Sequence, residues 1–414
     1  MVHQSPESSA EYVELMSRWG EHFTCIAPDT PGFGYSDPLS GSPEIGDFAD
    51  ALSEFVGAIR LQGCLAYGFH SGGIILVTTL KRHPELFSAL AIGGYAIWTE
   101  EEMRIFGESY LPPFQPSAYG EHLAWLWNRI LEQTWFFPWF DVRDEARLPN
   151  PKGDPAHVQK TVMTMLDSGD AYRAGYGAVL RAPRDIPPPD EATAPVFISA
   201  YRADPLYAHI DRLGELPRSW QARKVETPED QETASLAFLQ EHASDGTCGA
   251  LPEDANEGWV EANGALVHWR GEQGADRLVL HAPADEMPAE IDAGTLAIDV
   301  PGHGLSEPAD DIRAAIEAAA EALGAERILW PAPPEGDPDR LYPDLTPRRF
   351  GEHLQTAWQV ARAEAMFRPW YDVQRDQAIA VDPARLALPE LARRSRARIR
   401  AGDAARVYHL LLQD

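Results

Sequence analysis

The sequence predicts an α/β protein with a mostly parallel sheet and a helical cap, followed by a second, truncated part of the same kind. One observation is that short apolar runs with β character alternate with segments that carry apolar residues at helical spacing. This alternation is typical of parallel sheets whose two faces are covered by helices. The other observation is that part of the first half of the chain recurs in the second half.

The elements of the first half follow one another in a regular order. Strands are predicted at residues 23–28, 63–68, 89–98, 194–201 and 220–225, and helices at residues 45–61, 73–83, 205–216 and 232–243. An insert at roughly residues 100–185, rich in Trp and Phe, separates the third strand from the fourth. Its helical pattern predicts a cap over the sheet.

Two segments of the first half return in the second half in the same order. The segment "APDTPGFGYSDP" (27–38) returns as "AIDVPGHGLSEP" (297–308). The segment "YGEHLAWLWNRILEQTWFFPWFDV" (119–142) returns, without a gap, as "FGEHLQTAWQVARAEAMFRPWYDV" (350–373). The interval between the two segments is much shorter in the second copy, so that copy lacks the strand, turn and helix that follow the first segment in the first copy.

These matches divide the chain into two domains. The first domain is predicted at residues 1–244, a polar linker rich in Gly, Pro and Asp at residues 245–257, and a partial second copy at residues 258–414. The second copy also contains "GALVHWRGEQGADRLVLHAP" (264–283), which predicts two strands that the first copy lacks. Either a segment upstream supplies such strands to the first copy, or the strands of the second copy complete the first sheet.

The stretch "CLAYGFHSGGIILVTTL" (64–80) combines an apolar strand, a turn between glycines and an apolar helix. Gly68 and Gly72 stand two residues before and two residues after His70. Glycines at these positions let the backbone and neighbouring strands approach the residue between them. The spacing therefore predicts that His70 is held above the C-terminal edge of the sheet.

The first copy resembles the α/β-hydrolase-fold superfamily over nearly all of residues 1–244. The resemblance depends on "HQSP" (3–6), "DTPGFGYSD" (29–37), the Gly-flanked turn, the cap insert and "SAYRADPL" (199–206), which occur in the order typical of that superfamily. More narrowly, the chain resembles a subgroup with Gly-x-His-[Ser/Thr]-Gly at the nucleophile elbow.

The resemblance implies a role for four residues. His70 occupies the nucleophile position, and Ser71, which follows it, would offer its backbone N–H to an oxyanion. Gln4 would supply the second N–H of that oxyanion hole. Asp204 matches the acid of the catalytic triad.

The chain departs from the superfamily at the triad histidine, which is expected shortly after the last strand. There the sequence reads "KVETPEDQE" (224–232), and the next histidine is His242 in the closing helix. Both the usual nucleophile and the usual base are therefore absent. His70 could act as a general base, as a direct nucleophile that forms an acyl- or phospho-imidazole, or as a structural residue of the turn.

Three further residues near the turn have alternative interpretations. Ser71 could be the nucleophile, but the glycines would then stand at positions −3 and +1, which does not suit the turn. His209, which follows the candidate acid in "DPLYAH" (204–209), could replace the missing base or lie on a helix surface. His3 could donate a hydrogen bond to a substrate oxygen or orient its own loop.

The aromatic residues of the cap could roof an apolar pocket or form the cap's own core. Trp125 and Trp135 are the better pocket candidates, because Thr356 and Met366 replace them in the copy that lacks the turn.

Composition excludes several classes of function. The net charge of −29 argues against nucleic acid and anionic membrane surfaces as partners. Three cysteines are too few for a disulfide framework, and no phosphate-loop, zinc-protease or calcium-loop motif is found, so neither a cofactor nor a metal is expected. Without a signal peptide or a long apolar span, the expected location is cytoplasmic.

The sequence thus leads to two functional hypotheses. The first is an enzyme that acts on a small, mostly apolar carbonyl or ester compound, by hydrolysis or by lyase-type proton transfer, with His70 as the base. The second is a catalytically inactive binding or scaffold protein on the same fold. The second copy could provide an intramolecular repeat–repeat interface, and a homo-oligomer is the other form of assembly considered.

Overall fold

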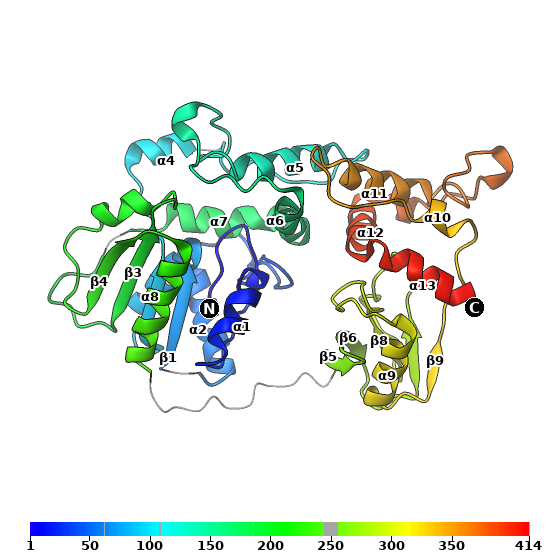
Figure 1. Ribbon diagram of the computed structural model, residues 1–414, viewed down its shortest axis with the longest axis horizontal. Helices are drawn as coiled ribbons and strands as arrows, with labels where there is room; N and C mark the ends of the chain where they lie inside the picture. The colour runs from blue at the N-terminus through cyan, green and yellow to red at the C-terminus, as the bar shows by residue number, and fades with distance from the viewer. Residues whose placement is uncertain (62, 107–108, 185, 244–255, 414) are drawn as a thin grey trace. The chain divides into compact units, whose positions relative to one another are not determined.

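In the computed structural model, four parallel strands form the central sheet of the first part of the chain (Figure 1). They lie in the order β1 (Cys64–Phe69), β2 (Phe87–Gly93), β3 (Val196–Tyr201) and β4 (Trp220–Val225). Val2 adds a parallel bridge to Gly68 on the free side of β1. The predicted parallel sheet is therefore confirmed.

Helices cover both faces of this sheet, as the alternating pattern predicts. Along β2, Leu90 and Ile92 belong to the core on one face, whereas Ala89 and Ala91 belong to the core on the other face. The first core also contains residues of α2 (Ile45–Ala58) and α3 (Ser71–Arg82), and the second contains residues of α1 (Val13–Trp19) and α8 (Pro228–Glu241). Alternation of side chains along a strand explains why both faces need cover.

The insert between β2 and β3 is helical, as expected for the cap at residues 100–185. Its helices are α4 (Glu100–Phe106), α5 (Glu121–Gln133), α6 (Pro155–Ser168) and α7 (Tyr172–Arg181). Asp154 caps α6 by accepting a hydrogen bond from the backbone N–H of His157 (3.1 Å), and a proline begins that helix.

Two predicted elements of the first part differ in the structure. Residues 23–28 form no strand. The Met1 ammonium group donates to the carbonyl of Ile26 (2.6 Å), but a single bond of this kind does not make the ladder of a sheet. The matching residues of the second copy, 293–298, do include a strand, since it lies between two others. The predicted helix at 205–216 is reduced to a 3-10 helix at Tyr207–Arg212.

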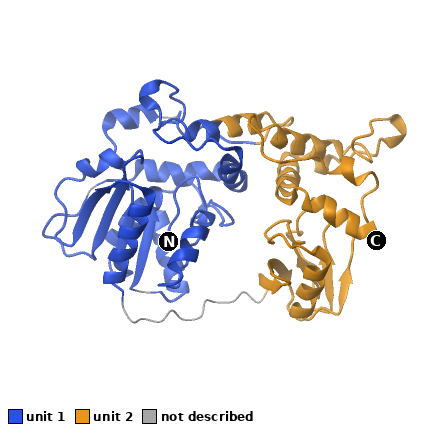
Figure 2. Cartoon of the chain, in the orientation of Figure 1, with its two compact units in different colours: residues 1–115, 129–251 blue, residues 116–128, 252–414 orange. Residues whose placement is uncertain are grey.

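The structure describes the whole chain except residues 62, 107–108, 185, 244–255 and 414. Two units can be distinguished (Figure 2): unit 1 contains residues 1–115 and 129–251, and unit 2 contains residues 116–128 and 252–414. Residues 116–128, which the sequence interpretation assigns to the first domain, thus belong to unit 2. The predicted linker at 245–257 lies outside the described residues except for its last two, and Glu257 already begins a strand.

Unit 2 has a sheet of its own. Its strands are β5 (Glu257–Ala262), β6 (Ala265–Gly271), β7 (Arg277–Leu280), β8 (Leu296–Ile298) and β9 (Arg327–Leu329), in the order β5-β6-β8-β7-β9. The pairs β5–β6 and β6–β8 are antiparallel, whereas β8–β7 and β7–β9 are parallel. The strands predicted within 264–283 therefore pair inside unit 2, and in the described part of the chain they do not join the first sheet.

The helices of unit 2 lie mainly after β8. They are α9 (Ile312–Leu323), α10 (Pro338–Leu341), α11 (Glu352–Ala363), α12 (Leu388–Ala401) and α13 (Ala404–Gln413). After β9, residues 330–337 contain no helix, so this strand is not followed by a turn of the kind found at His70.

Two tryptophans at matching positions of the similar segments 119–142 and 350–373 make reciprocal contacts within unit 2. Trp127 donates its indole N–H to the backbone carbonyl of Arg349 (3.0 Å), and Trp358 donates to the carbonyl of Ala118 (3.3 Å). The ring contacts are reciprocal too, because Trp127 meets His353 edge-on at 5.0 Å and Trp358 meets the equivalent histidine of the first copy at 4.8 Å. Contacts in which residue i of one segment meets residue j of the other, and j of the first meets i of the second, are typical of a two-fold interface.

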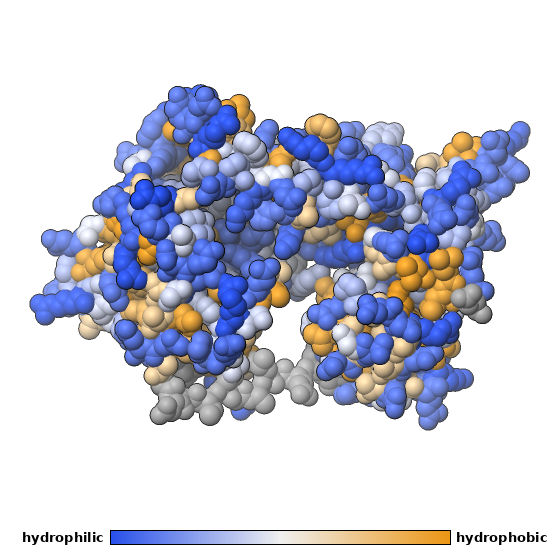
Figure 3. Space-filling view, viewed as in Figure 1, coloured by the Kyte–Doolittle hydropathy of each residue, from blue (hydrophilic) through white to orange (hydrophobic). Residues whose placement is uncertain are grey.

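The face of the molecule in Figure 3 is mainly hydrophilic, and its hydrophobic residues lie in separate groups. None of the helices in the described part of the chain is long and apolar enough to cross a bilayer.

Candidate active site

The turn between β1 and α3 holds His70 in a left-handed backbone conformation (φ 47°, ψ −109°). Glycine is required beside it because a Cβ at Gly72 would lie 1.9 Å from the carbonyl oxygen of Val2. A Cβ at Gly68 would lie 2.8 Å from the backbone of Gly72. These close approaches give the glycines at positions 68 and 72 their physical reason.

His70 is paired with a buried carboxylate that follows β3. Its Nε2 lies 3.1 Å from Oδ1 and 3.0 Å from Oδ2 of Asp204, whose side chain is fully buried after β3. The Leu206 N–H also donates to the Asp204 carboxylate (2.7 Å). Because an ionised carboxylate only accepts hydrogen bonds, this geometry assigns the proton to Nε2 and leaves the lone pair on Nδ1.

Ser71 begins α3, and its side chain turns toward the N-terminal loop. Among the described residues, its hydroxyl bonds to Ser5, from whose N–H it accepts (2.5 Å) and to whose hydroxyl it donates (3.2 Å). None of the described residues accepts a hydrogen bond from the Ser71 N–H. This N–H therefore remains directed outward from the first turn of the helix, where helix dipoles favour negative charge.

Gln4 is not arranged as the second oxyanion donor that the resemblance implies. Its backbone N–H donates to Oε2 of Glu11 (3.0 Å), and its side-chain amide donates to Oε1 of the same residue (3.1 Å). Ser5 was missed by the sequence interpretation, although it also lines the cavity and its N–H faces Ser71.

The Glu11 carboxyl has a raised pKa. Burial raises the pKa of its carboxyl to about 8, and the neighbouring Glu7 carboxyl adds to the shift, while the two Gln4 hydrogen bonds oppose it. The folded chain therefore holds a proton that the unfolded chain releases at lower pH.

This proton predicts that the free energy of unfolding falls with rising pH. The fall should extend from the ordinary carboxyl pKa of 4.5 to about 8, where the folded Glu11 also ionises. We expect Glu11→Gln to flatten this dependence, as measured by chemical denaturation across that range. Glu14→Gln, at an exposed position of α1, is the matched control; an equal slope in Glu11→Gln and wild type would contradict the assignment.

The two other candidate histidines are engaged elsewhere. His3 is buried, accepts the Thr30 N–H at Nε2 (2.9 Å) and places Nδ1 2.9 Å from the carbonyl of Gln4. His209 accepts the Ile97 N–H at Nδ1 (2.9 Å), and burial, with the nearby Arg212 charge, lowers its pKa to about 4. Neither residue lines the cavity at His70, so both have structural partners instead of a substrate to contact.

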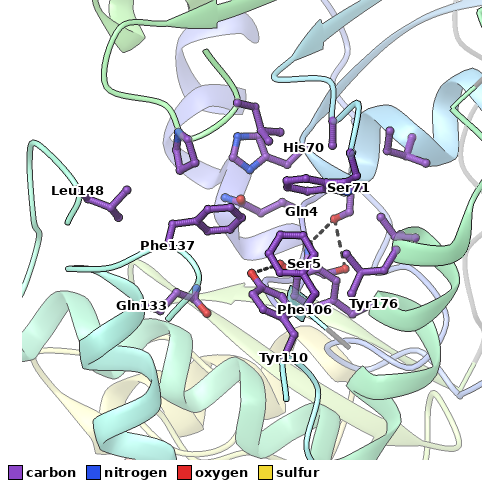
Figure 4. A pocket seen from close by; sticks show the side chains of 17 residues that line it. Gln4, Ser5, His70, Ser71, Phe106, Tyr110, Gln133, Phe137, Leu148 and Tyr176 are labelled. Atoms are coloured by element: carbon purple, nitrogen blue, oxygen red, sulfur yellow. Dashed lines mark hydrogen bonds between the residues drawn. The ribbon is translucent and has the colours of Figure 1, made fainter. Parts of the chain in front are cut away.

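A cavity of about 170 Å³ lies in front of His70 within unit 1 (Figure 4). Its apolar lining includes Trp98, which precedes the cap, and Phe106 and Phe137 of the cap. Its polar lining consists of Gln4, Ser5, His70, Ser71, Tyr110, Gln133 and Tyr176. Few polar groups in a mostly apolar pocket are typical of small-molecule sites.

The predicted pocket tryptophans do not line this cavity. Trp135 is 36% exposed and carries the guanidinium of Arg147 over its ring (6.0 Å), and Trp125 belongs to the part of α5 that packs in unit 2. The comparison of the two copies that selected these tryptophans would also have selected Gln133, which Glu364 replaces in the second copy.

In the described part of the chain, no group of three or more His, Cys, Asp or Glu side chains is placed to hold a metal ion.

Comparison with known sequences concerns mainly the first part of the chain. A family model described as the alpha/beta hydrolase fold matches residues 1–114. Haloalkane dehalogenase 2 of Mycobacterium bovis is 26% identical over 121 residues, which are 29% of this chain and 42% of that protein. The protein of the same name from Mycobacterium tuberculosis matches to the same extent. The chain thus spans less than half the length of these relatives.

Several solved structures also resemble the chain. A thermophilic esterase from Thermogutta terrifontis is 15% identical, with 59% of this chain and 89% of the esterase covered and a TM-score of 0.42. The haloalkane dehalogenase DatA from Agrobacterium tumefaciens is 17% identical, with 58% of this chain and 88% of DatA covered and a TM-score of 0.42.

Proposed function

We propose that unit 1, whose first 114 residues match the model of the alpha/beta hydrolase fold, is a hydrolase for small, mostly apolar ester or lactone compounds, with His70 as general base. The observation that carries the proposal is the pairing of His70 with the buried Asp204 at the edge of a mostly apolar cavity. His70 thus stands at the position of the nucleophile, and it has the carboxylate partner that the histidine of a triad usually has.

The reaction begins with a water molecule beside Nδ1 of His70. As the water oxygen adds to the substrate carbonyl carbon, its proton passes to Nδ1, and an oxyanion and an imidazolium form. The intermediate then expels the alkoxide, which takes the proton from Nδ1, so that an acid and an alcohol leave. The Asp204 carboxylate stabilises the imidazolium throughout, as an acid does in a triad.

The oxyanion would accept hydrogen bonds from two donors at the turn. The Ser71 N–H, at the first turn of α3, is one donor. The Gln4 N–H is held by Glu11, and the Ser5 N–H is held by the Ser71 hydroxyl. We therefore assign the second donor to the hydroxyl of Ser5, which accepts from Ser71 and keeps its own proton to donate.

Ser71 is a weaker candidate for the nucleophile. Its hydroxyl is bonded to Ser5, and the structure records no hydrogen bond from it to His70, although both residues are described. A serine nucleophile needs a base within hydrogen-bond reach of its hydroxyl.

We also infer that residues 258–414 are a partial second copy with a non-catalytic role. Hydrogen bonds that recur in both parts support this. His281 in unit 2 accepts the Val300 N–H at Nε2 (2.9 Å) and approaches the carbonyl of Ala282 with Nδ1 (2.8 Å), as His3 does with its own loop. The reciprocal tryptophan contacts of α5 and α11 support an intramolecular repeat–repeat interface.

The proposal is tested by assaying a panel of aryl esters and small lactones with wild type, His70→Ala and Ser71→Ala. We expect turnover by wild type and by Ser71→Ala, and loss of turnover in His70→Ala, because the base is removed while the backbone N–H of residue 71 remains.

Other outcomes have distinct meanings. Loss of activity with Ser71→Ala but not with His70→Ala would overturn the assignment of the base in favour of a serine nucleophile. If wild type turned over no ester or lactone but released cyanide from a hydroxynitrile, His70 would act as the base of a lyase by removing the hydroxyl proton. No turnover of any compound by wild type would favour the binding or scaffold protein.

A further inference from the structure

Arg129 on α5 is a buried cation, and none of the described residues forms an ion pair with it. Its side chain is only 1% exposed, and its guanidinium lies over the rings of Trp139 (5.3 Å) and Tyr172 (5.9 Å). Nη1 donates to Oε1 of Gln133 (2.9 Å), whereas Nε and Nη2 have no hydrogen-bond partner among the described residues. A buried charge that lacks a counter-charge is costly, so its persistence calls for an explanation.

Gln133 connects this cation to the cavity. It lies one helical turn after Arg129, and its side chain lines the cavity that contains His70. Because the amide oxygen of Gln133 accepts from Arg129, its amide N–H groups remain as donors. In Figure 4, Gln133 and Tyr110 lie at the end of the cavity away from His70.

Two tyrosines add a further donor at this end of the cavity. The hydroxyls of Tyr110 and Tyr176 are 3.1 Å apart, so one donates to the other and one hydroxyl proton is left over. Burial raises the pKa of both tyrosines, which keeps them protonated, while the nearby Arg129 charge acts in the opposite direction.

We propose that this end of the cavity binds a carboxylate group of the substrate, with Gln133 and the tyrosine pair as direct donors and Arg129 as the counter-charge behind them. The inference deepens the proposed function and rests on it: the preferred substrate is a short ester that carries a terminal carboxylate opposite the bond attacked at His70.

The corresponding helix of unit 2 supports the idea by contrast. At the matching positions, Val360 of α11 stands in place of Arg129, and Glu364, directly after α11, stands in place of Gln133. Glu364 is paired with Arg394 (2.5 Å) and with Arg398. In α11 the charges are thus balanced inside the protein, whereas in α5 none of the described residues supplies the anion and a ligand can do so.

The first experiment compares 4-nitrophenyl hemiglutarate, which carries the carboxylate, with neutral 4-nitrophenyl butyrate. We expect wild type to prefer the charged ester by about tenfold or more in kcat/KM, since a charge-assisted hydrogen bond is roughly twice as strong as a neutral one. Gln133→Glu should abolish the preference, because it places an internal carboxylate next to Arg129. Arg129→Met should also abolish it, and Arg129→Lys should retain part of it.

The second experiment measures binding without turnover. Glutarate should raise the unfolding temperature of both wild type and His70→Ala, whereas glutaramide, its neutral analogue, should not. Because the readout needs no catalysis, stabilisation by glutarate without ester turnover would refute the proposed hydrolase and keep the anion site. Ester turnover with equal rates for both esters, or no stabilisation by glutarate of wild type, would overturn the anion site; Gln133→Glu tests it even if Arg129→Met does not fold.

Discussion

Asp204→Asn is expected to lower kcat about 10³- to 10⁴-fold, comparable with the loss of the triad acid in serine hydrolases. The amide that replaces the carboxylate cannot stabilise the imidazolium by charge. If its NH₂ group donates to Nε2 of His70, the proton moves to Nδ1, and the nitrogen that should activate water is then blocked. KM should change much less than kcat, because Asp204 is buried behind His70 and does not line the cavity.

The measurement is steady-state kinetics on the best ester of the panel, with the unfolding temperature recorded for each variant. Asp211→Asn is the matched control, since Asp211 belongs to the same connection but its side chain is 69% exposed and bonds to Lys224. A folded Asp204→Asn protein with kcat within about tenfold of wild type would show that Asp204 does not determine the tautomer, against the general-base mechanism.

Trp127→Ala and Trp358→Ala are each expected to reduce the free energy of unfolding by about 3–5 kcal/mol, the usual cost of truncating a buried aromatic side chain. Both side chains are essentially buried (0% and 1% exposed). Each loses the hydrogen bond to the opposite segment and leaves that carbonyl without its donor. The two losses should be similar, because the contacts are reciprocal.

Chemical denaturation of the full chain, followed by far-ultraviolet circular dichroism, measures the effect. Trp259→Ala is the control in the same unit, since Trp259 is 55% exposed. The double variant should lose less than the sum of the single losses, because the two residues share one interface. The two-fold description would be contradicted if one of the two variants lost several kcal/mol of unfolding free energy and the other lost no more than Trp259→Ala.

Local sequence features predicted the turn and the sheet around it well. At Gly68 and Gly72 a side chain is excluded, because backbone atoms lie 2.8 Å and 1.9 Å from where a Cβ would stand, and such constraints act over a few residues. Strand 23–28 failed for the opposite reason. Its apolar residues have β character, but a strand needs neighbours, and the described chain gives it no ladder.

The assignment of oxyanion donors failed for a similar reason. A motif identifies which loop is near the site, but it does not show which of its N–H groups are free. The Gln4 N–H is taken by Glu11, on a 3-10 helix further along the chain, and the Ser5 N–H is taken by Ser71. Likewise, Tyr110, Tyr176 and Gln133 come from three different parts of the cap, and no spacing in the sequence brings them to one cavity.

By itself, the sequence determined that a histidine stands between two glycines at the end of an apolar strand, that no histidine occurs at 224–232, and that two segments of the first half resemble two segments of the second. These properties depend on residue type and local spacing. Only the tertiary structure decided that Asp204, far along the chain, bonds to Nε2 of His70 and that Arg129 is buried with no anion from the described residues beside it. Hydrogen bonding and desolvation depend on which distant groups the fold brings within about 3 Å, and local spacing does not encode that.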